Sequence, residues 1–508
     1  MTAIVGIDLG TTNSAIAVLD RTGKPEIVEN SDGESITPSV VYFESDATST
    51  VVVGTAAKNS DILRDGRSFK EFKRRMPQSA NSPLGNAELQ VTPVQLSSFV
   101  LKKLLKDASA RLGAIGKVVV TVPANFANEA RLATIRAGEL AGYTIDDIVN
   151  EPTAALLCYS MARPITGKVM VYDFGGGTLD VTVAQVRGRD IQILTSKGDP
   201  KLGGADFDKR LTDLIAKKFE ATTGERLDPA IHTIGKTSEE YKKHLSSRED
   251  VAVQVAGGTS GRSIFKITRK EFENSSATLI SKADLLVESA LDEANIRPTD
   301  ISDVFLVGGS TRMPMIKEHL TKLFGREPVC HLNPDEVVAL GAALYAGYKE
   351  DPAKLNAAQV AVAQSVQLRE VANHYFGTLV LGRDAASGRA AKLVSPIIDK
   401  NTPLPCSKTE AYYTVREGQT GVNCEVTQST TRESDPDFVR IIWSGSLGPL
   451  PEGRPAEMEI RVTFSYDSNQ VMHCRFEDVA TGMAKEVNIG LKDDEVSTGH
   501  SIDKFLVE

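Results

Sequence analysis

The stretch IVGIDLGTTNSAIAVLD, residues 4–20, decides the fold of this chain. A β-branched apolar run ends at Asp8, a Gly and two Thr follow, and a second apolar run begins almost at once. This pattern predicts two strands joined by a tight glycine turn. The same order returns in VMVYDFGGGTLDVTVAQV, residues 169–186, with Asp173 before the turn. A single structural explanation must therefore account for both copies.

Glycine in these two turns has a chemical use. Without a Cβ it adopts positive φ and lets main-chain N–H groups approach an anion, and the Thr hydroxyls add donors. An isolated turn of this kind is more often a plain hairpin with a capping Asp. Two copies about 165 residues apart in similar strand contexts instead predict facing turns that hold a polyphosphate. Asp8 and Asp173 are then placed to orient a hydrated divalent metal.

Composition bounds the possible functions. The chain has 508 residues, 41% of them apolar and 25% charged, which predicts a globular protein of two or three domains. A formal charge of −9 argues against a general nucleic-acid binder but leaves nucleotide binding open. The five cysteines lack CxxC spacing, which argues against a disulfide framework or zinc site and suits a reducing compartment. We expect no secretory signal, no spanning helix and a cytoplasmic location.

The chain divides into three parts. Strands and helices alternate up to about residue 347, as in the strand at 117–123 and the helix at 128–142, and this predicts a layered α/β domain over 1–349. The Ala- and Gln-rich, polar segment 350–371 is predicted to be a linker. Short alternating segments separated by turn residues predict an antiparallel β-sandwich over 372–508. The chain stops about 20 residues after the last predicted strand, so no helical bundle is expected there.

The phosphate motif is not one of the commoner kinds. GxxxxGK[ST] does not occur, and no GxGxxG leads from a strand into a helix. VGGSTR at 307–312 supplies a third glycine pair between a predicted strand and a predicted helix, where its amides would support a nucleotide. Taken alone, that motif is as well explained as an ordinary turn.

Together the motifs resemble the 70-kilodalton heat-shock chaperone family, the DnaK type, within the actin and sugar-kinase superfamily. Motifs in family order cover nearly all of 1–350, and a looser collinear match continues through the sandwich. The motifs that carry the resemblance are GIDLGTTNS (6–14), VTVPANF (120–126), VNEPTAALLCY (149–159), YDFGGGTLDVT (172–182), LGGADFD (202–208), KKHLSSRED (242–250), LVGGSTRMP (306–314) and NPDEVVALGAAL (333–344). The resemblance implies an actin-like two-lobed ATPase domain followed by a peptide-binding β-sandwich, in a divergent member without the helical lid.

The resemblance also implies site residues. Lys73 and Glu151 match the residues beside the γ-phosphate and the attacking water, with Asp8 and Asp173 near Mg²⁺. Asp180 and Thr178 match positions that help hold K⁺ in relatives, although Asn13 departs from the residue usual there. The residues implied to contact ATP or ADP are Gly10, Thr11, Thr12, Asn13, Gly175, Gly176, Gly177, Thr178, Glu239, Lys242, Lys243, Ser246, Gly308, Gly309, Ser310, Arg312 and Asp335.

Without the family match, these assignments have plainer alternatives. Lys73 lies in a basic run that usually marks a solvated face, and Glu151 is also explained as a first-turn helix acid beside Pro152. Residues 239, 242, 243 and 246 follow the i, i+3, i+4, i+7 spacing of one helix face. That face is solvated and charged in most proteins.

In the family, ATP draws the sandwich onto the ATPase domain through an apolar linker, and hydrolysis releases it to grip peptide. Here the matching segment is Gln367 to Glu370, in which two apolar positions are polar. At roughly 25 cal/mol/Å², the lost burial would cost a few kcal/mol. We therefore expect weak coupling or a different contact surface. Pro123 and Arg131, which match the family relay to the linker, are present, and Asn125 replaces the usual aromatic residue.

The implied partners are unfolded or extended polypeptides and a nucleotide-exchange factor. Alignment suggests Leu381, Tyr412, Val422 and Cys424 as walls of the peptide cleft, with ordinary sandwich core as the alternative. Asp147 stands where relatives usually have an arginine that meets a J-domain partner, and an acid there would repel the acidic tip of that partner. J-domain partnership is therefore left open.

The sequence favours an ATP-hydrolysing chaperone that binds exposed apolar segments. One alternative is a small-molecule kinase, since sugar kinases share the cleft, but the sandwich after 371 counts against it. The other is a nucleotide-dependent scaffold or filament protein whose sandwich binds one dedicated partner.

Overall fold

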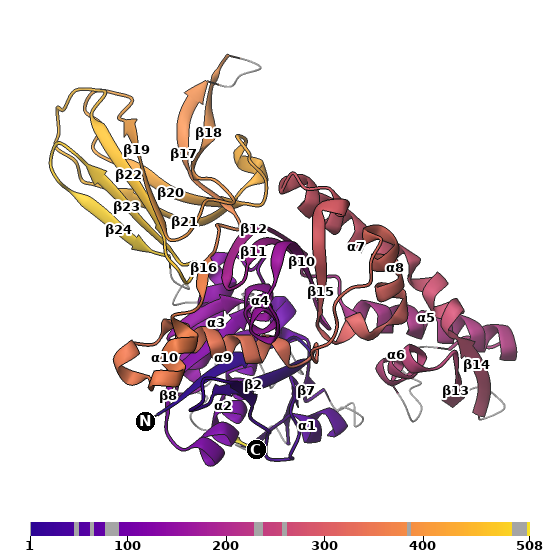
Figure 1. Cartoon of the computed structure of the whole chain (residues 1–508). Coiled ribbons are helices and arrows are strands. Elements are labelled where there is room, and N and C mark those ends of the chain that lie inside the picture. The colour runs from indigo at the N-terminus through magenta and orange to yellow at the C-terminus, as the bar shows by residue number, and fades with distance from the viewer. Residues whose placement is uncertain are drawn as a thin grey trace.

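Two sheets built on the same plan organise the α/β part of the chain (Figure 1). The computed structural model describes residues 2–44, 50–60, 66–76, 91–227, 237–256, 262–383, 388–489 and 505–508. Each sheet contains an antiparallel hairpin whose first strand also pairs with a parallel neighbour. The opening stretch and its second copy form these two hairpins, which confirms the predicted duplication of the strand–turn–strand unit.

The first lobe holds the sheet β3-β2-β1-β8-β9, with β4 beside β2. Helices α2 and α3 pack together against this lobe, and a smaller outer sheet lies beside α1. A capping box fixes the start of α2, because Thr92 accepts from the Gln95 N–H and Gln95 accepts from the Thr92 N–H. The elements of this lobe are β1 (Ala3–Asp8), β2 (Asn13–Leu19), β3 (Pro25–Ile27), β4 (Thr37–Pro38), β5 (Val41–Phe43), β6 (Thr50–Val53), α1 (Thr55–Ser60), β7 (Ser68–Phe69), the 3₁₀ turn η2 (Phe72–Arg75), α2 (Pro93–Leu112), β8 (Ile115–Val122), α3 (Asn128–Leu140) and β9 (Asp147–Asn150).

The second lobe holds the sheet β15-β10-β11-β12-β16. Helices α4 and α9 pack against each other, and α9 covers β1 and β2 of the first lobe. The elements are α4 (Glu151–Ala162), β10 (Thr166–Phe174), β11 (Leu179–Arg187), β12 (Asp190–Asp199), α5 (Gly204–Thr223), α6 (Ser238–Ser247), β13 (Asp250–Ala256), β14 (Arg262–Thr268), α7 (Arg269–Glu293), η3 (Pro298–Asp300), β15 (Ile301–Val307), η4 (Gly309–Arg312), α8 (Pro314–Phe324), α9 (Val337–Lys349), η5 (Pro352–Lys354), α10 (Ala357–Ala363) and β16 (Gln367–Arg369).

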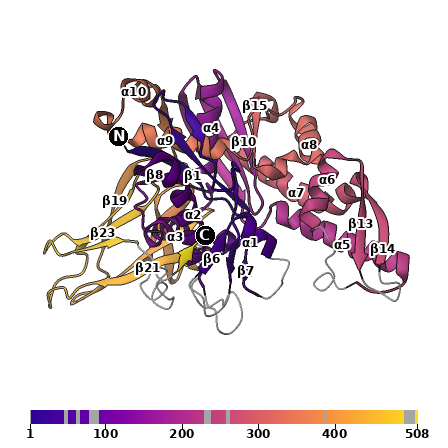
Figure 2. The ribbon, with the colours of Figure 1, turned by 90° about the horizontal axis from the view of Figure 1, so that it is seen from below.

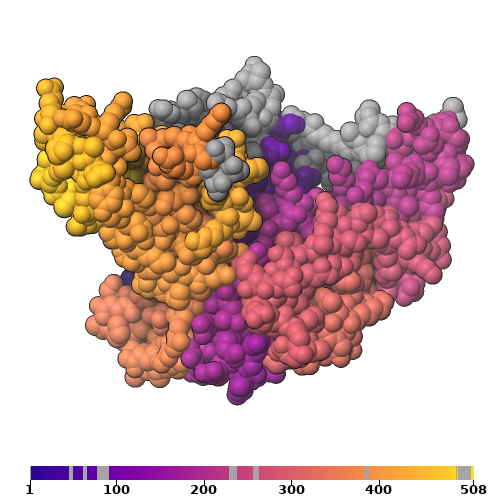
Figure 3. Space-filling model, turned by 90° about the horizontal axis from the view of Figure 1, so that it is seen from above, coloured from indigo at the N-terminus to yellow at the C-terminus, as the bar shows by residue number. Residues whose placement is uncertain are grey.

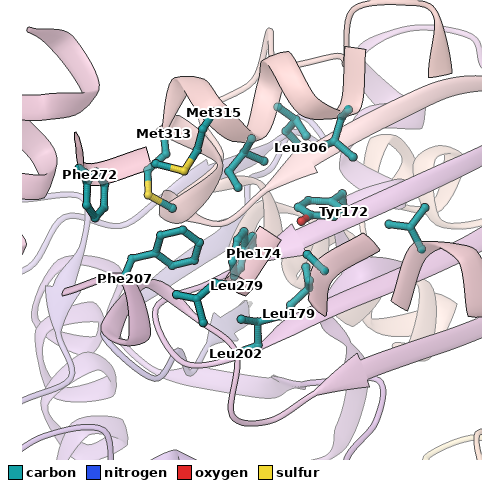
Figure 4. Close-up of a cluster of buried hydrophobic side chains, with 14 of the residues drawn as sticks. Tyr172, Phe174, Leu179, Leu202, Phe207, Phe272, Leu279, Leu306, Met313 and Met315 are labelled. Atoms are coloured by element: carbon teal, nitrogen blue, oxygen red, sulfur yellow. The ribbon is translucent and has the colours of Figure 1, made fainter. Parts of the chain in front are cut away.

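An aromatic core stabilises the second lobe beneath its glycine turn (Figure 4). Phe174 and Phe207 meet edge to face with ring centroids 5.7 Å apart, and Phe207 also contacts Phe272 from α7. Met313 and Met315, at the start of α8, fill the space beside these rings. Because Phe174 is the last residue of β10, this packing fixes the position of the turn that follows it.

The sandwich consists of the sheets β18-β17-β20-β21 and β19-β22-β23-β24. Alternating residues of both sheets point inward to a separate core, as the predicted antiparallel sandwich requires. The elements are β17 (Tyr375–Arg383), β18 (Ala390–Ile398), β19 (Cys406–Tyr413), β20 (Val422–Ser429), η6 (Pro436–Phe438), β21 (Arg440–Leu447), β22 (Glu459–Tyr466), β23 (Met472–Asp478) and β24 (Ala484–Asn488). A last strand, β25 (Leu506–Val507), belongs to the outer sheet of the first lobe.

The segment 350–371, predicted to be a linker, is folded against the two lobes. Helix α10 packs on α9. Strand β16 adds to the edge of β12 in parallel, with Leu368 opposite Ile191. Leu368 packs on the buried cluster between the lobes while Gln367 and Arg369 face solvent. The polar replacements therefore occupy outward positions of a short added strand.

The sandwich lies directly against the two lobes (Figures 1 and 3). Asn128 of α3 accepts from the Met472 N–H at 3.1 Å, and Arg440 pairs with Glu129 at 3.0 Å. On the other lobe, Glu293 at the end of α7 accepts from Lys400 and Asn401. Contacts to both lobes define the arrangement that we call docked.

Candidate nucleotide cleft

The two glycine turns meet face to face. A Cβ placed on Gly176 would lie 1.8 Å from Thr12 Oγ1, and one placed on Gly177 would lie 2.5 Å from Thr11 Cγ2. Only glycine therefore fits at either position of the second turn. The first turn is braced by Ser14 Oγ, which accepts from the Gly10 N–H at 3.1 Å, and by Ser39, which donates to the Gly10 carbonyl. The sequence prediction that these turns lie opposite each other agrees with this geometry.

Four carboxylates gather below the turns. Burial, followed by the charge of Glu151, raises the pKa of Asp8 to about 7, although Lys73 opposes the shift. Burial and the same neighbour hold the pKa values of Asp173 and Asp180 well above the usual range. The register places Asp173 opposite Asp180 on adjacent strands. The negative charges of this cluster therefore exceed the one positive charge that Lys73 brings to it.

Asp180 is the least satisfied member of this cluster. It is buried, and neither of its carboxylate oxygens has a hydrogen-bond partner of normal geometry in the described part of the chain. The Asn125 backbone N–H faces it and only partly offsets the raised pKa. Buried unpartnered carboxylate oxygens fit a hard cation such as Mg²⁺ or K⁺. Within the described ranges no three His, Cys, Asp or Glu side chains form a direct ligand set, so water is needed to complete the shell of any ion held here.

Lys73 is the cation of the cleft. It lies in η2, is only 3% exposed, and its Nζ is 2.7 Å from Glu151 Oε1. It also donates to the Leu9 carbonyl, at the start of the first glycine turn. Glu151 is the first residue of α4, and Thr121 Oγ1 donates to Asp8 Oδ1 at 3.2 Å. Lys73 of the basic run is therefore buried in the interior. The alternative that this lysine belongs to a solvated charged face does not hold.

Arg74 was missed by the sequence prediction. Its Nε donates to the Gly177 carbonyl at 2.8 Å, and its Nη2 lies 2.5 Å from Asp206 Oδ2 at the start of α5. A first-lobe residue thus grips the turn of the second lobe. The signal was the same basic run that contains Lys73, but a run of like charges does not reveal which members point inward.

Helix α6 closes the far side of the cleft. Lys58 of α1 pairs with Glu239 at 2.9 Å, and Lys243 pairs with the same carboxylate at 2.7 Å. Burial alone would raise the pKa of Glu239, but hydrogen bonds from Lys243 and Lys58 outweigh it and lower the pKa to about 2. Ser246 Oγ donates to the Lys242 carbonyl at 3.1 Å.

Lys242 turns inward from this helix. Its Nζ donates to the Gly204 carbonyl and lies 2.8 Å from Asp208, so it braces the start of α5. Opposite α6, Ser310 Oγ donates to the Gly175 carbonyl at 2.8 Å. Arg312 pairs with Asp335 at 2.7 Å. Gly308 has φ +80°, and a Cβ there would lie 2.5 Å from the Phe174 carbonyl oxygen, so the third glycine pair packs against the second turn.

The remaining phosphate-site positions flank the turns. Asn13 begins β2 and lies opposite Pro38 of β4. Thr178 is buried, and its carbonyl accepts from the Gly175 N–H at 3.1 Å, which closes the second turn. Gly309 approaches the carboxylate of Asp335, which a Cβ on that glycine would meet at 2.8 Å.

The four suggested peptide-cleft residues have different environments. Leu381 on β17 is 65% exposed. Tyr412 and Val422 pack at the edge of the sandwich core, and the Tyr412 hydroxyl is 3.0 Å from Ser395 Oγ. Cys424 is buried within that core, which matches the alternative that the sequence left open for it.

A polar relay joins the cleft to the linker. Arg131, 1% exposed, donates to Asn150 Oδ1 at 2.8 Å. Asn150 in turn donates to Glu370 at 3.2 Å, and Thr153 donates to Glu370 at 2.6 Å. Burial raises the pKa of Glu370, and these hydrogen bonds oppose the shift. Since Glu151 lies between Asn150 and Thr153, the linker acid contacts the same helix start that holds Lys73.

Asp147 lies in a different environment from the one the sequence suggested. Its carboxylate is 2.7 Å from Lys117 and 3.7 Å from Lys349. These two ammonium groups compensate its charge, so the repulsion argued from sequence is weakened.

Comparison with known proteins agrees with this geometry. The family model described as Hsp70 protein matches residues 4–508. The chain belongs to the Hsp70 family. The chain is 37% identical over 495 residues to the chaperone protein DnaK of Thermotoga neapolitana, covering 94% of this chain and 79% of that protein. It is 36% identical over 513 residues to DnaK of Thermotoga petrophila, covering 97% and 82% respectively.

Membership of this family makes the chain an ATP-dependent chaperone of the Hsp70 type, with an actin-like ATPase domain and a β-sandwich. The expected family, fold class, ATPase activity and chaperone function are thereby confirmed. The chain spans about four-fifths of the length of these relatives.

Proposed function

We propose that this chain hydrolyses ATP between its lobes with Lys73 and Glu151 beside the γ-phosphate and the two glycine turns around the phosphate chain. The observation that carries the proposal is the buried Lys73–Glu151 pair, 2.7 Å apart, directly beside the first turn. A compact ammonium in a dry site stabilises the charge that builds on the phosphoryl oxygens. Glu151 orients the ammonium and accepts a hydrogen bond from the attacking water, and ADP and phosphate are the products.

The acidic residues serve the cations that accompany the nucleotide. Asp8 and Asp173 would hold Mg²⁺, and Asp180 with Thr178 would hold K⁺. The unpartnered oxygens of Asp180 and the raised pKa of Asp8 support this division. When bound, the metal supplies charge neutralisation on the terminal phosphates.

The adenosine lies between α6 and the third glycine pair. Glu239, Lys243 and Ser246 contact the ribose and base from one side, with Gly308 to Arg312 and Asp335 on the other. Lys242 acts indirectly, because its ammonium is engaged with Gly204 and Asp208. The Lys58–Glu239 pair closes the two lobes over the nucleotide.

The sandwich binds extended apolar polypeptide segments by main-chain hydrogen bonds and apolar pockets. Nucleotide state controls this binding through β16 and the polar relay at Glu370. A nucleotide-exchange factor assists the cycle, and the compensated charge of Asp147 keeps a J-domain partner compatible with this surface.

The cysteines are all free, which suits a cytoplasmic location. None of the helices in the described ranges combines the length and apolar character that a bilayer crossing needs.

Lys73→Ala tests the proposal. We expect ATP binding by calorimetry to persist while single-turnover hydrolysis falls by roughly 100-fold or more, since the lost group acts on the transition state. The matched control is Arg75→Ala, an exposed residue of the same run, which should hydrolyse ATP at the parent rate. Near-parent turnover by Lys73→Ala would remove this lysine from the mechanism.

A further inference from the structure

The chain returns to the first lobe after the sandwich. Strand β25 pairs in parallel with β6, so that Leu506 lies opposite Thr50 and Val507 opposite Val51. The contact extends to Glu508, which donates to the Val51 carbonyl at 2.9 Å and accepts from the Val53 N–H at 2.8 Å. In Figure 2 the C label accordingly lies among the labels of α1, α2 and β6.

Side chains make this contact specific. The Phe505 ring meets Phe43 at 5.7 Å and Phe99 at 5.6 Å between centroids, both edge to face. Val507 is 2% exposed and belongs to the core of the first lobe. Lys106 of α2 donates to the Val507 carbonyl at 2.9 Å. Backbone pairing plus alternate side-chain pockets is the pattern by which a sheet edge captures an extended peptide.

The sandwich is therefore attached to the ATPase domain on both sides. Its first attachment is β16, at the edge of β12. At its other end Ile489 is buried in the sandwich core, and its carbonyl accepts from Asn128 of α3. Residues 490–504 connect this end to Phe505 along the chain.

We propose that the edge of β6 and the Phe43–Phe99 pocket form a binding groove for the chain's own C-terminal segment, Phe505–Glu508. This contact keeps the sandwich beside the ATPase domain when the contact at β16 is released. The groove takes an extended segment with an aromatic residue two positions before a buried aliphatic one.

The test uses a variant that lacks residues 505–508 and a fluorescein-labelled peptide of residues 501–508, SIDKFLVE. We expect saturable binding to the shortened chain by fluorescence anisotropy and at least tenfold weaker binding to the intact chain, whose groove is filled. A peptide with Ala at the position of Phe505 should lose binding at least tenfold. In the shortened chain, Lys106→Ala should weaken binding severalfold, and Lys102→Ala on the same helix should leave it unchanged.

Because the sandwich also takes apolar peptides, an unrelated extended apolar peptide serves as competitor. Displacement by that competitor, or equal affinity for the intact and shortened chains, overturns the groove.

Should the shortened chain fail to fold, hydrogen exchange at the Val53 amide in Phe505→Ala gives the answer instead. Faster exchange than in the intact chain supports the groove, and an unchanged rate overturns it. The role of Phe505–Glu508 in keeping the sandwich beside the ATPase domain is tested by small-angle X-ray scattering. Glu370→Ala that also lacks residues 505–508 should have a larger radius of gyration than Glu370→Ala alone, and equal radii overturn that role.

Discussion

Glu370, the acid that follows β16, accepts a 2.6 Å hydrogen bond from Thr153 Oγ1, two residues beyond Glu151 on α4. The same helix start thus holds Lys73 of the cleft on one side and the linker on the other. Any shift of Glu151 on nucleotide hydrolysis would be transmitted to Glu370 over this short path. Two hydrogen bonds from the start of α4, donated by Asn150 and Thr153, therefore hold the linker acid in place.

Glu370→Ala should favour release of the sandwich from the ATPase domain. Each hydrogen bond to a charged group contributes about 1.5–3 kcal/mol, so losing even one of the two would shift the docking equilibrium by roughly 10- to 150-fold. Trp443 stacks on Phe476 within the sandwich and lies on β21, the strand whose Arg440 pairs with Glu129 of the ATPase domain. Its fluorescence therefore reports the release of the sandwich when ATP is added. Gln367→Ala, at an exposed position of β16, should retain the parent response. An undiminished signal in Glu370→Ala would place coupling elsewhere.

Glu293→Ala should destabilise the docked arrangement more than any exposed ion pair would. Lys400, 4% exposed in its side chain, lies 2.9 Å from Glu293, and burial lowers the pKa of Lys400 to about 8 while Glu293 opposes the shift. Removing one partner of a fully buried pair costs about 3–5 kcal/mol because the other charge stays unpaired, and the cost here is smaller because the Glu293 side chain is 23% exposed. We expect urea denaturation to show a lowered midpoint.

The double variant Glu293→Ala with Lys400→Met separates this cause from simple loss of packing. It removes both charges, so it should recover most of the lost stability. A double variant as unstable as Glu293→Ala alone would contradict the account. Glu293 also bonds Thr195 and Lys197 of the second lobe, and some loss should therefore persist.

His374 makes stability depend on pH. Burial, with Arg131 and Lys400 nearby, lowers the pKa of His374 to about 3 from an ordinary value near 6.5. Between these values the unfolded chain binds the proton and the folded chain does not, so the free energy of unfolding falls as pH is lowered from about 6.5. Urea midpoints measured from pH 7.5 to 5 should decline, and His374→Gln should decline less. Parallel curves for the two proteins would show that His374 does not contribute.

The duplicated turns were predictable because they depend on local rules. Glycine beside an acid at the end of a β-branched strand has few uses, and two copies made the hairpins of Asp8 and Asp173 evident. The layered order of strands and helices followed from periodicity alone. The roles of Lys73 and Glu151 came from resemblance, since spacing leaves a basic run and a first-turn acid ambiguous.

Contacts between residues far apart in the sequence could not be predicted from the sequence alone. Asp147 reads as a bare acid, and only the folded chain brings Lys117 and Lys349 to it. Strand β25 has only two residues, too few for a recognisable strand pattern, and its partner β6 lies more than 400 residues earlier in the sequence. Residues 350–371 read as a linker because their apolar positions are sparse, yet those few suffice to fold α10 and β16 onto existing surfaces.

Arg74→Ala should accelerate nucleotide release. Arg74 joins η2 of the first lobe to the Gly177 carbonyl and to Asp206 of the second, so its removal frees the lobes to separate. At about 1.5 kcal/mol for a charged hydrogen bond, we expect roughly tenfold faster dissociation of a fluorescent ADP analogue in stopped-flow. Hydrolysis per bound nucleotide should stay within about twofold, because the Lys73–Glu151 pair is intact.

Asp206→Asn should also accelerate nucleotide release, with a smaller effect than Arg74→Ala, since the bond from Arg74 to Gly177 remains. Arg75→Ala provides the baseline, and a release rate for Arg74→Ala that matches it would mean that the lobes are held by other contacts, foremost Lys58 to Glu239.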